Sequence, residues 1–315
     1  MNDTLRSLFQ IAIIKIIRPY IVRELPGWGK IYLMAVGSYK RNWFWAGAPE
    51  QVIQGKLHGY RMHLDLEKWA DRGAFFLGRW YDLPTQLFLL DHLRQGQTVI
   101  DVGANRGMFA LLASSLVGNA GRVICFEPNP DCVRLLKREI ASNQIANIAV
   151  NEFALGEQDE RLALVIPKIN TGEATLGKSS YPEHAVSKLE VQVRKGDDAL
   201  QNENPSLIKI DVEGFEPKVI VGLEGTLRRT RPIIMTEIVA KHLANCGSSV
   251  PELIALMNGL RYDGFRLNIR REKRRYVWTL APLEGDAKTG DAVWFHRDAQ
   301  NRPLHAGKDY GQVAG

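Results

Sequence analysis

Residues 98–107 read TVIDVGANRG and run directly into the apolar stretch MFALLASSL at residues 108–116. The first five residues are typical of a buried strand, the apolar stretch is typical of a helix, and a turn with two glycines lies between them. A strand, a tight turn and a helix form the first half of a βαβ unit. These residues therefore predict that an α/β sheet begins at residue 98.

The same alternation of short β-branched runs and helical stretches continues to residue 296. Further strands are expected over residues 123–126, 148–150, 207–210, 232–237, 265–269 and 292–296, with helices over residues 216–228 and 251–260. Strands that alternate with helices form a parallel sheet covered on both faces. The sequence therefore predicts an α/β fold with a Rossmann-like, doubly wound, mostly parallel sheet of seven strands.

A β insertion is expected between the third and fourth strands of this sheet. Its two strands are predicted over residues 161–167 and 189–194, and the loop between them contains glycine, serine and proline. Loops of this kind are common places for functional residues. We therefore expect the insertion to cover the site.

The chain divides into a basic, amphipathic arm over residues 1–59, the α/β domain over residues 60–298 and a loose tail over residues 299–315. Apolar residues recur at helical spacing in the arm, at Leu5, Leu8, Phe9, Ala12, Ile13, Ile16, Ile17 and Tyr20. They predict an amphipathic helix that ends at or soon after Pro19. Two interpretations stay open: the helix docks on the α/β domain through its apolar face, or it lies on a membrane surface.

The formal net charge of +6 comes from the arm, because residues 1–61 contain nine Lys or Arg against three Asp or Glu and the remainder is balanced. A neutral α/β domain does not favour a nucleic-acid partner. Three scattered cysteines favour neither a disulfide framework nor a thiolate metal site. Since no apolar run approaches the roughly 20 residues of a membrane span, and no signal peptide is evident, we expect a cytoplasmic protein with at most peripheral contact to the inner membrane face. The sequence does not set the oligomeric state.

The turn after the first strand is the first predicted binding motif. Its glycines allow a tight bend, and the amides that open the following helix favour a carboxylate or another anion. An acid at the end of the strand is suited to the positive amino group of an amino-acid ligand. The residues assigned to this contact are Asp101, Gly103, Ala104, Asn105 and Gly107.

The second motif is FEPNP at residues 126–130. Glu127 ends the second strand twenty residues after Gly107, where an acid accepts both hydroxyl hydrogens of a ribose, while Pro128 and Asn129 are placed to flank an adenine. The first turn lacks the three-glycine fingerprint of a dinucleotide site, which disfavours a nicotinamide cofactor. The two motifs together favour S-adenosylmethionine (SAM), and Ala154 after the third strand completes the expected cofactor contacts.

The third motif, IKIDVEG at residues 208–214, ends the fourth strand. Methyl transfer is an in-line displacement, so a protein aligns donor and acceptor and removes the acceptor proton where this is a hydroxyl. Asp211 and Glu213 are the predicted catalytic residues, and the alternative for each is to orient the SAM amino group or to cap the next helix. His184, Glu237 and His242 are further candidates.

A metal is a weaker prediction for the same strand ends. The carboxylates of Asp211, Glu213 and Glu237 are suited to a hard divalent cation if they converge. Carboxylates at strand ends are common in this kind of fold, so a metal is not favoured.

Taken together, VIDVGANRG, FEPNP and LIKIDVEG resemble the FkbM-type family of SAM-dependent methyltransferases, over a stretch from about Tyr60 to His296. The resemblance implies a class I methyltransferase fold, SAM as the methyl donor, and O-methylation of sugar residues or secondary metabolites. Residues 194–198 read RKGDD where the family often has a Thr-Leu-Asp-like stretch, so acceptor contacts there are not carried over.

Basic residues crowd the end of the expected sixth strand, at Arg266, Arg270, Arg271, Lys273, Arg274 and Arg275. They predict a rim for an anionic acceptor, with a solvated charged surface as the alternative. Two other functions stay open. RNA ribose methylation is suggested by the order Lys68, Asp211, Lys241 and Glu272, and a non-catalytic, membrane-associated SAM-binding or scaffold protein is suggested by the arm.

Overall fold

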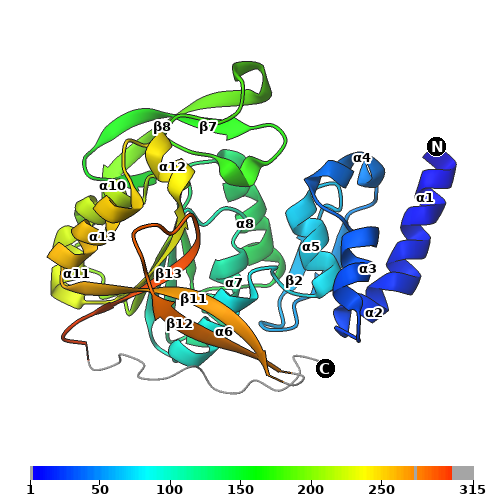
Figure 1. Cartoon of the computed structure of the whole chain (residues 1–315), viewed down its shortest axis with the longest axis horizontal. Helices are drawn as coiled ribbons and strands as arrows, with labels where there is room; N and C mark the ends of the chain where they lie inside the picture. Colours follow the sequence, from blue (N-terminus) through cyan, green and yellow to red (C-terminus); the bar gives the residue numbers. More distant parts are fainter. Residues whose placement is uncertain (1–2, 273–274, 300–315) are drawn as a thin grey trace. The chain divides into compact units, whose positions relative to one another are not determined.

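The structure is a computed structural model that describes residues 3–272 and 275–299 (Figure 1). Its contacts divide these residues into two units, residues 3–83 and residues 84–299. None of the described helices is both long and apolar enough to cross a bilayer. Most of the tail predicted over residues 299–315 lies outside the described residues.

The first unit is mainly helical. Its elements are α1 (Asp3–Ala12), a π-helical turn (Ile13–Ile17), α2 (Arg18–Val22), α3 (Trp28–Ala35), a 3-10 turn (Tyr39–Arg41), α4 (Asn42–Trp45), the antiparallel pair β1 (Gln51–Gln54) and β2 (Arg61–Leu64), and α5 (Trp69–Leu77). The wide π-helical turn ends two residues before Pro19, whose ring lacks an N–H and crowds the preceding turn of a regular helix. The predicted helix therefore continues past Pro19 and ends at Val22.

The boundary between the units lies at residue 83 instead of residue 59. Buried Arg72 of α5 explains the difference, because its guanidinium donates hydrogen bonds to the carbonyl oxygens of Val36 and Ser38 and to Oδ1 of Asn42. A buried guanidinium must satisfy its donors. The residues after the predicted boundary are therefore held by the helical arm.

The second unit is built on one sheet in the order β12-β11-β13-β10-β9-β3-β4-β5. The strands are β3 (Thr98–Val102), β4 (Arg122–Phe126), β5 (Ile148–Asn151), β9 (Leu207–Ile210), β10 (Ile233–Val239), β11 (Tyr262–Glu272), β12 (Arg275–Pro282) and β13 (Thr289–His296). The first five of these strands are parallel, β13 runs against both β10 and β11, and β12 runs against β11. The α/β class is as expected, but a mostly parallel sheet of seven strands was predicted, and the observed sheet is mixed and has eight strands because β12 extends the edge.

Helices cover both faces of this sheet (Figure 1). They are α6 (Leu83–His92), α7 (Met108–Val117) and α8 (Pro130–Ser142), followed by α10 (Glu216–Gly222), α11 (Glu224–Thr230), α12 (Ala240–Asn245) and α13 (Val250–Gly259). From β3 the chain adds β4 and β5 on one side of the sheet, and then β9 and β10 on the other side of β3. Because the crossovers between parallel strands are right-handed, α7 and α8 cover one face of the sheet and α10 and α11 cover the other. The core between the sheet and α10, α11 and α13 is apolar, with Ile208, Ile210 and Ile234 at its centre.

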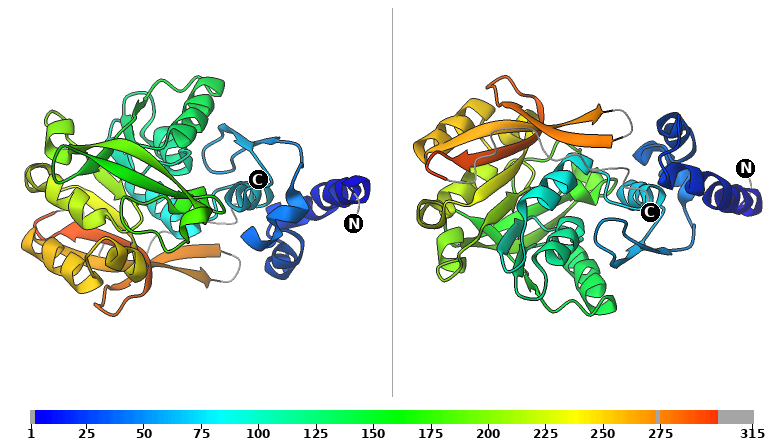
Figure 2. Two further views of the ribbon diagram at one scale, coloured as in Figure 1. Left: turned by 90° about the horizontal axis from the view of Figure 1, so that it is seen from above. Right: turned by 90° about the horizontal axis from the view of Figure 1, so that it is seen from below.

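The predicted insertion is a three-stranded sheet with a short helix after it. It consists of β6 (Ala154–Gly156), β7 (Glu160–Pro167) and β8 (Val186–Lys195), and α9 (Gly196–Ala199) follows. In the view from above in Figure 2, β7 and β8 lie in front of the main sheet. The loop between them is anchored there, because Thr175 Oγ1 donates to the carbonyl oxygen of Glu213 over 2.8 Å and the Lys178 N–H donates to that of Asn245. The insertion therefore covers the carboxyl ends of the strands.

Candidate active site

The glycine turn after β3 lies against the end of β9. Gly103 has φ +80°, and a Cβ at this position would lie 1.9 Å from the carbonyl oxygen of Asp211. Gly107 has φ +85°, and a Cβ there would lie 2.3 Å from Cδ1 of Leu136. Both φ values belong to the left-handed region that favours glycine. The tight turn is as predicted, but the close approach is to the protein's own atoms, where we expected a ligand.

Glu127 is fixed at the end of β4 by two backbone N–H groups. Asn105 donates to Oε2 over 2.7 Å, and Asn129 donates to Oε1 over 2.8 Å. Glu127 is 7% exposed, and burial raises the pKa of its carboxyl to about 7 although both N–H bonds oppose the shift. Each oxygen keeps acceptor capacity beyond the bond it already makes. The acid thus offers two oriented acceptors, an arrangement suited to the paired hydroxyls of a ribose.

The other residues predicted to contact the cofactor lie around this acid or behind it. Ala104 is buried in the turn, and Pro128 lies in the link between β4 and α8. The side chain of Asn129 is occupied as the cap of α8, where it accepts from the Asp131 N–H. Ala154 is buried in β6 and pairs with Val193 of the insertion. Contact between these residues and a cofactor stays a prediction.

Asp101 is completely buried beside a lysine–aspartate pair. Neither of its carboxylate oxygens has a hydrogen-bond partner among the residues that the structure describes. Burial raises the pKa of Asp101 to about 6, with Lys209 opposing the shift and Asp211 adding to it. Lys209 Nζ lies 2.7 Å from Oδ2 of Asp211, and although burial disfavours its charge, Asp211 and Asp101 raise the pKa of Lys209 above its ordinary value. In this arrangement Asp101 acts behind the surface of the site, and direct contact with a ligand would need a rearrangement.

Glu213 and His242 form the second pair of the site. Glu213 has φ +53°, and a Cβ on the following Gly214 would lie 2.2 Å from the carbonyl oxygen of His242, so the turn lies directly on α12. His242 Nδ1 lies 2.5 Å from Glu213 Oε2, and both atoms are buried. The hydrogen bond with Glu213 raises the pKa of His242, while burial raises that of Glu213. A proton on Nδ1 would therefore face this carboxylate, which leaves Nε2 as the second reactive position of the imidazole.

The three predicted acids do converge. One carboxylate oxygen each from Asp211, Glu213 and Glu237 lies within 4.8 Å of the others. Burial, together with repulsion from the other acids, raises the pKa of Glu237 to about 10. Protonation is therefore one way in which the protein relieves this repulsion, and the spacing alone does not establish a metal site. His184, by contrast, is exposed on a 3-10 turn of the insertion, Glu183–Ala185.

Glu216 was missed as a structural acid of the site. It is buried at the start of α10, and its Oε1 accepts from the N–H groups of Val212 and Gly214. Burial raises the pKa of Glu216 to about 7. The acid holds the turn that carries Glu213. Its place three residues after Glu213, at the first position of a predicted helix, is the signal that could have identified it.

Space beside Glu213 and His242 is small. The cavity that they line with Thr175, Ser180 and Tyr181 measures about 10 Å³, which is room for about one water molecule. A sugar ring is much larger. An acceptor of that size therefore requires the loop of the insertion that carries Ser180 to move away from α12, to which Asn245 Nδ2 binds it through a hydrogen bond to Ser180 Oγ.

The predicted basic rim is only partly available. β11 is antiparallel to β13, which is antiparallel to β10, so the end of β11 points toward the carboxyl edge as expected. Arg266 donates to the carbonyl oxygen of Thr289, Arg270 pairs with Glu272, and Arg271 lies over the ring of Tyr276. Lys273 and Arg274 lie outside the described residues, as does the side chain of Arg275. RNA ribose methylation also stays a prediction. Of the four residues that suggested it, Lys68 belongs to the first unit and Asp211, Lys241 and Glu272 belong to the second.

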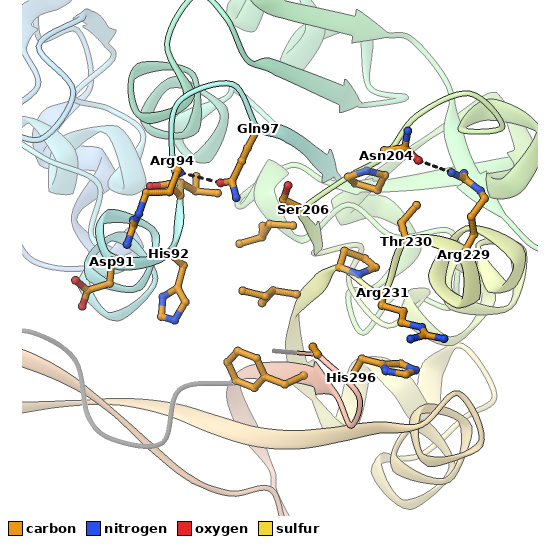
Figure 3. Close-up of a pocket in the computed structure, with 17 residues that line it drawn as sticks. Asp91, His92, Arg94, Gln97, Asn204, Ser206, Arg229, Thr230, Arg231 and His296 are labelled. Atoms are coloured by element: carbon orange, nitrogen blue, oxygen red, sulfur yellow. Dashed lines mark hydrogen bonds between the residues drawn. The ribbon is translucent and has the colours of Figure 1, made fainter. Parts of the chain in front are cut away.

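A larger pocket of about 830 Å³ lies at the opposite end of the sheet (Figure 3). It is lined by Leu207 and Ile233 where β9 and β10 begin and by His296 where β13 ends, with Arg229 and Arg231 on one side. Ligands of open α/β sheets bind at the carboxyl ends of the strands. This pocket is therefore separate from the site of Glu127 and Glu213.

Comparison with known proteins places this arrangement in a family. The profile described as Methyltransferase FkbM domain matches residues 101–267, just over half of the chain. The match includes Asp101, Glu127, Asp211 and His242. The chain belongs to the FkbM methyltransferase family, as the sequence motifs predicted, and it is a SAM-dependent methyltransferase.

Several solved structures are similar to the chain at low identity and low TM-score. An FkbM methyltransferase from Methylobacillus flagellatus KT is 14% identical, with a TM-score of 0.38 over 85% of this chain and 60% of that chain. A SAM-dependent O-methyltransferase from Thermotoga maritima is 9% identical, with a TM-score of 0.40 over 69% of this chain and 65% of that chain. Fibrillarin from Aeropyrum pernix, crystallised with natively bound SAM, is 14% identical, with a TM-score of 0.36 over 67% of this chain and 73% of that chain. The chain thus spans less than two thirds of the first two structures. No curated protein matches it.

Proposed function

We propose that the protein transfers the methyl group of SAM to a hydroxyl of a sugar or of a related metabolite. The observation that carries the donor half is the carboxylate of Glu127, held in place by the N–H groups of Asn105 and Asn129. When bound, SAM supplies an electrophilic methyl group on a sulfonium. Glu127 would hold its ribose, and the turn over residues 103–107 would hold its amino-acid end.

The Glu213–His242 pair supports a hydroxyl acceptor. A hydroxyl must lose its proton as its oxygen forms the new bond to carbon, and the electrons of the broken carbon–sulfur bond remain on sulfur. His242 Nε2 makes no hydrogen bond with the rest of the described chain, while its Nδ1 faces Glu213. Glu213 thereby orients the imidazole and stabilises its charged form, and Nε2 accepts the proton. Asp211 is the less suitable base because Lys209 already occupies one of its oxygens.

The acceptor is proposed to enter under the insertion. The small cavity at His242 favours a loop that opens for the acceptor and then excludes water. Opening around Ser180 would break the hydrogen bonds that Asn245 makes with Ser180 Oγ and with the Lys178 N–H, while the bond from Thr175 to Glu213 could stay in place. Arg270 and Arg271 at the end of β11 make an anionic group on the acceptor a reasonable part of the proposal. Both side chains are exposed, so they would contribute through charge more than through fixed geometry.

Transfer itself is tested by incubating the full chain with SAM and a panel of nucleotide-activated hexoses, 6-deoxyhexoses and short oligosaccharides. The expected result is formation of S-adenosylhomocysteine (SAH) together with a hydroxyl-methylated product whose mass rises by one CH₂ group. His242→Ala should abolish most of this product, whereas His184→Ala, which changes an exposed histidine, should not. Methylation of nitrogen or carbon in place of oxygen would overturn the proposal.

A further inference from the structure

The first helix of the protein is turned with its apolar side outward. Leu8 is 60% exposed, Phe9 is 51% exposed and Ile16, in the following π-helical turn, is 73% exposed. Leu5 lies at the same helical spacing and is 45% exposed. In contrast, Gln10 on the other side of α1 is 2% exposed. This reverses the arrangement expected when an amphipathic helix docks on its own domain through apolar residues.

Polar contacts hold the helix in this orientation. Gln10 Nε2 donates to the carbonyl oxygen of Phe44 over 2.6 Å. Arg18 Nε donates to the carbonyl oxygen of Phe75 over 3.0 Å, and its guanidinium lies 4.4 Å from the centre of the Phe75 ring. Rolling the helix to bury Leu8 would break these bonds and leave the carbonyl oxygens of Phe44 and Phe75 without these donors. Among residues 3–83, nothing in the first unit thus covers this apolar side.

The same unit exposes other large apolar side chains. Leu33 and Met34 of α3 are 69% and 72% exposed, and Trp43 of α4 is 64% exposed. Scattered apolar residues on a surface are normal, but a stripe at helical spacing marks an interaction surface. Tryptophan is enriched where membranes meet water.

The positive charge of the first unit favours one kind of partner for this apolar side. The described residues of the first unit, 3–83, carry twelve Lys or Arg and seven Asp or Glu. A second copy would bring the same excess of positive charge to the contact, whereas anionic lipid headgroups complement it. The continuous helix from Asp3 to Val22 carries four charged residues, Asp3, Arg6, Lys15 and Arg18, and is not apolar enough to span a bilayer, so the contact is interfacial. We infer that the outer side of α1, formed by Leu5, Leu8, Phe9 and Ile16, docks on an anionic membrane surface.

Vesicle flotation of the full chain tests this inference. The protein should float with phosphatidylcholine vesicles that contain phosphatidylglycerol, and much less with phosphatidylcholine alone or at high salt. The double variant Leu8→Ser, Ile16→Ser should weaken binding by at least about ten-fold, because it removes two apolar anchors. Val52→Ser on β1 and Val221→Ser on α10 are the matched controls, since these valines are 52% and 39% exposed and belong to other elements of the fold. They should bind as the unchanged protein does.

Two further measurements separate the outcomes. Equal melting temperatures and equal SAH affinities for the double variant and the controls show that the fold and the donor site are intact, so a loss of flotation is then specific to α1. The inference is overturned if the unchanged protein does not float with anionic vesicles, or if the double variant floats equally well. It is also overturned if light scattering without vesicles shows a dimer that the double variant dissociates, because a second copy then covers the stripe.

Discussion

The N–H of Asn105 donates a hydrogen bond to Oε2 of Glu127 over 2.7 Å, and this bond joins the two motifs that bind the donor in our account. The turn after β3 thereby orients the acid at the end of β4. Burial of that acid keeps the pKa of its carboxyl at about 7 in the absence of ligand. The donor site is therefore both prearranged and sensitive to pH.

The affinity for SAH should fall as the pH drops below about 7. A protonated Glu127 can accept fewer hydrogen bonds from the ribose hydroxyls than the carboxylate can, and its pKa near 7 places this change between pH 8 and 6. Calorimetry with SAH across this range measures the effect. Glu127→Gln should bind more weakly at pH 8 and lose the dependence. A dependence that persists unchanged in Glu127→Gln would assign it to another group.

Gly103→Ala should destabilise the protein by more than about 2 kcal/mol, because the new Cβ meets a carbonyl oxygen and the backbone is left-handed. Gly96→Ala is the matched control, since Gly96 has φ +83° but nothing within 4 Å of a Cβ. That substitution should cost only the conformational strain of about 1 kcal/mol. Chemical denaturation gives the free energy of unfolding of both variants. If both lose the same amount, the contact between the new Cβ and the carbonyl oxygen of Asp211 is not the cause.

Replacing His242 by Ala should lower kcat by about 10²- to 10⁴-fold while leaving SAH affinity unchanged. The rate should also fall at low pH, because the base must be neutral and Glu213 raises the pKa of His242. Glu213→Gln removes that carboxylate, so the fall should move to lower pH. These pH–rate profiles distinguish a base from a structural histidine. The same pH–rate profile in the unchanged protein and in Glu213→Gln would contradict the assignment of His242 as the base.

Glu216 should make the free energy of unfolding depend on pH. Its pKa is raised from an ordinary 4.5 to about 7 in the folded protein, so its contribution is fully present below pH 4.5 and is lost as the pH rises through 7. The loss is on the order of 1–3 kcal/mol. Glu216→Gln keeps an acceptor for the N–H groups of Val212 and Gly214 and should show less of this fall. Denaturant titrations at pH 5 and 8 give the free energy of unfolding of the unchanged protein and of Glu216→Gln. If the difference between the two pH values is the same in both proteins, Glu216 is not its source.

The sequence predicted the bounds of a strand best where a run of β-branched residues coincides with a buried strand of the sheet. The strands at Thr98–Val102 and Leu207–Ile210 begin and end where their β-branched runs do. β12 (Arg275–Pro282) was missed because the adjacent basic run suggested a charged rim, although Tyr276, Trp278 and Leu280 alternate as a strand would.

Tertiary contacts account for the other differences. Periodicity identified the apolar side of α1 but not which side is buried, and the bond from Gln10 to Phe44 decides that. Similarly, the spacing of Glu127 after Gly107 predicted an acid at the donor site, whereas the N–H groups that hold the acid depend on the folded turns.

Calorimetry with SAH on the unchanged protein and on Glu127→Ala tests the central claim most directly. We predict a one-site isotherm that the substitution weakens by at least about ten-fold, while Glu152→Ala at an exposed position has no effect. Absence of SAH binding, or equal affinity in the protein and in Glu127→Ala, would contradict the account.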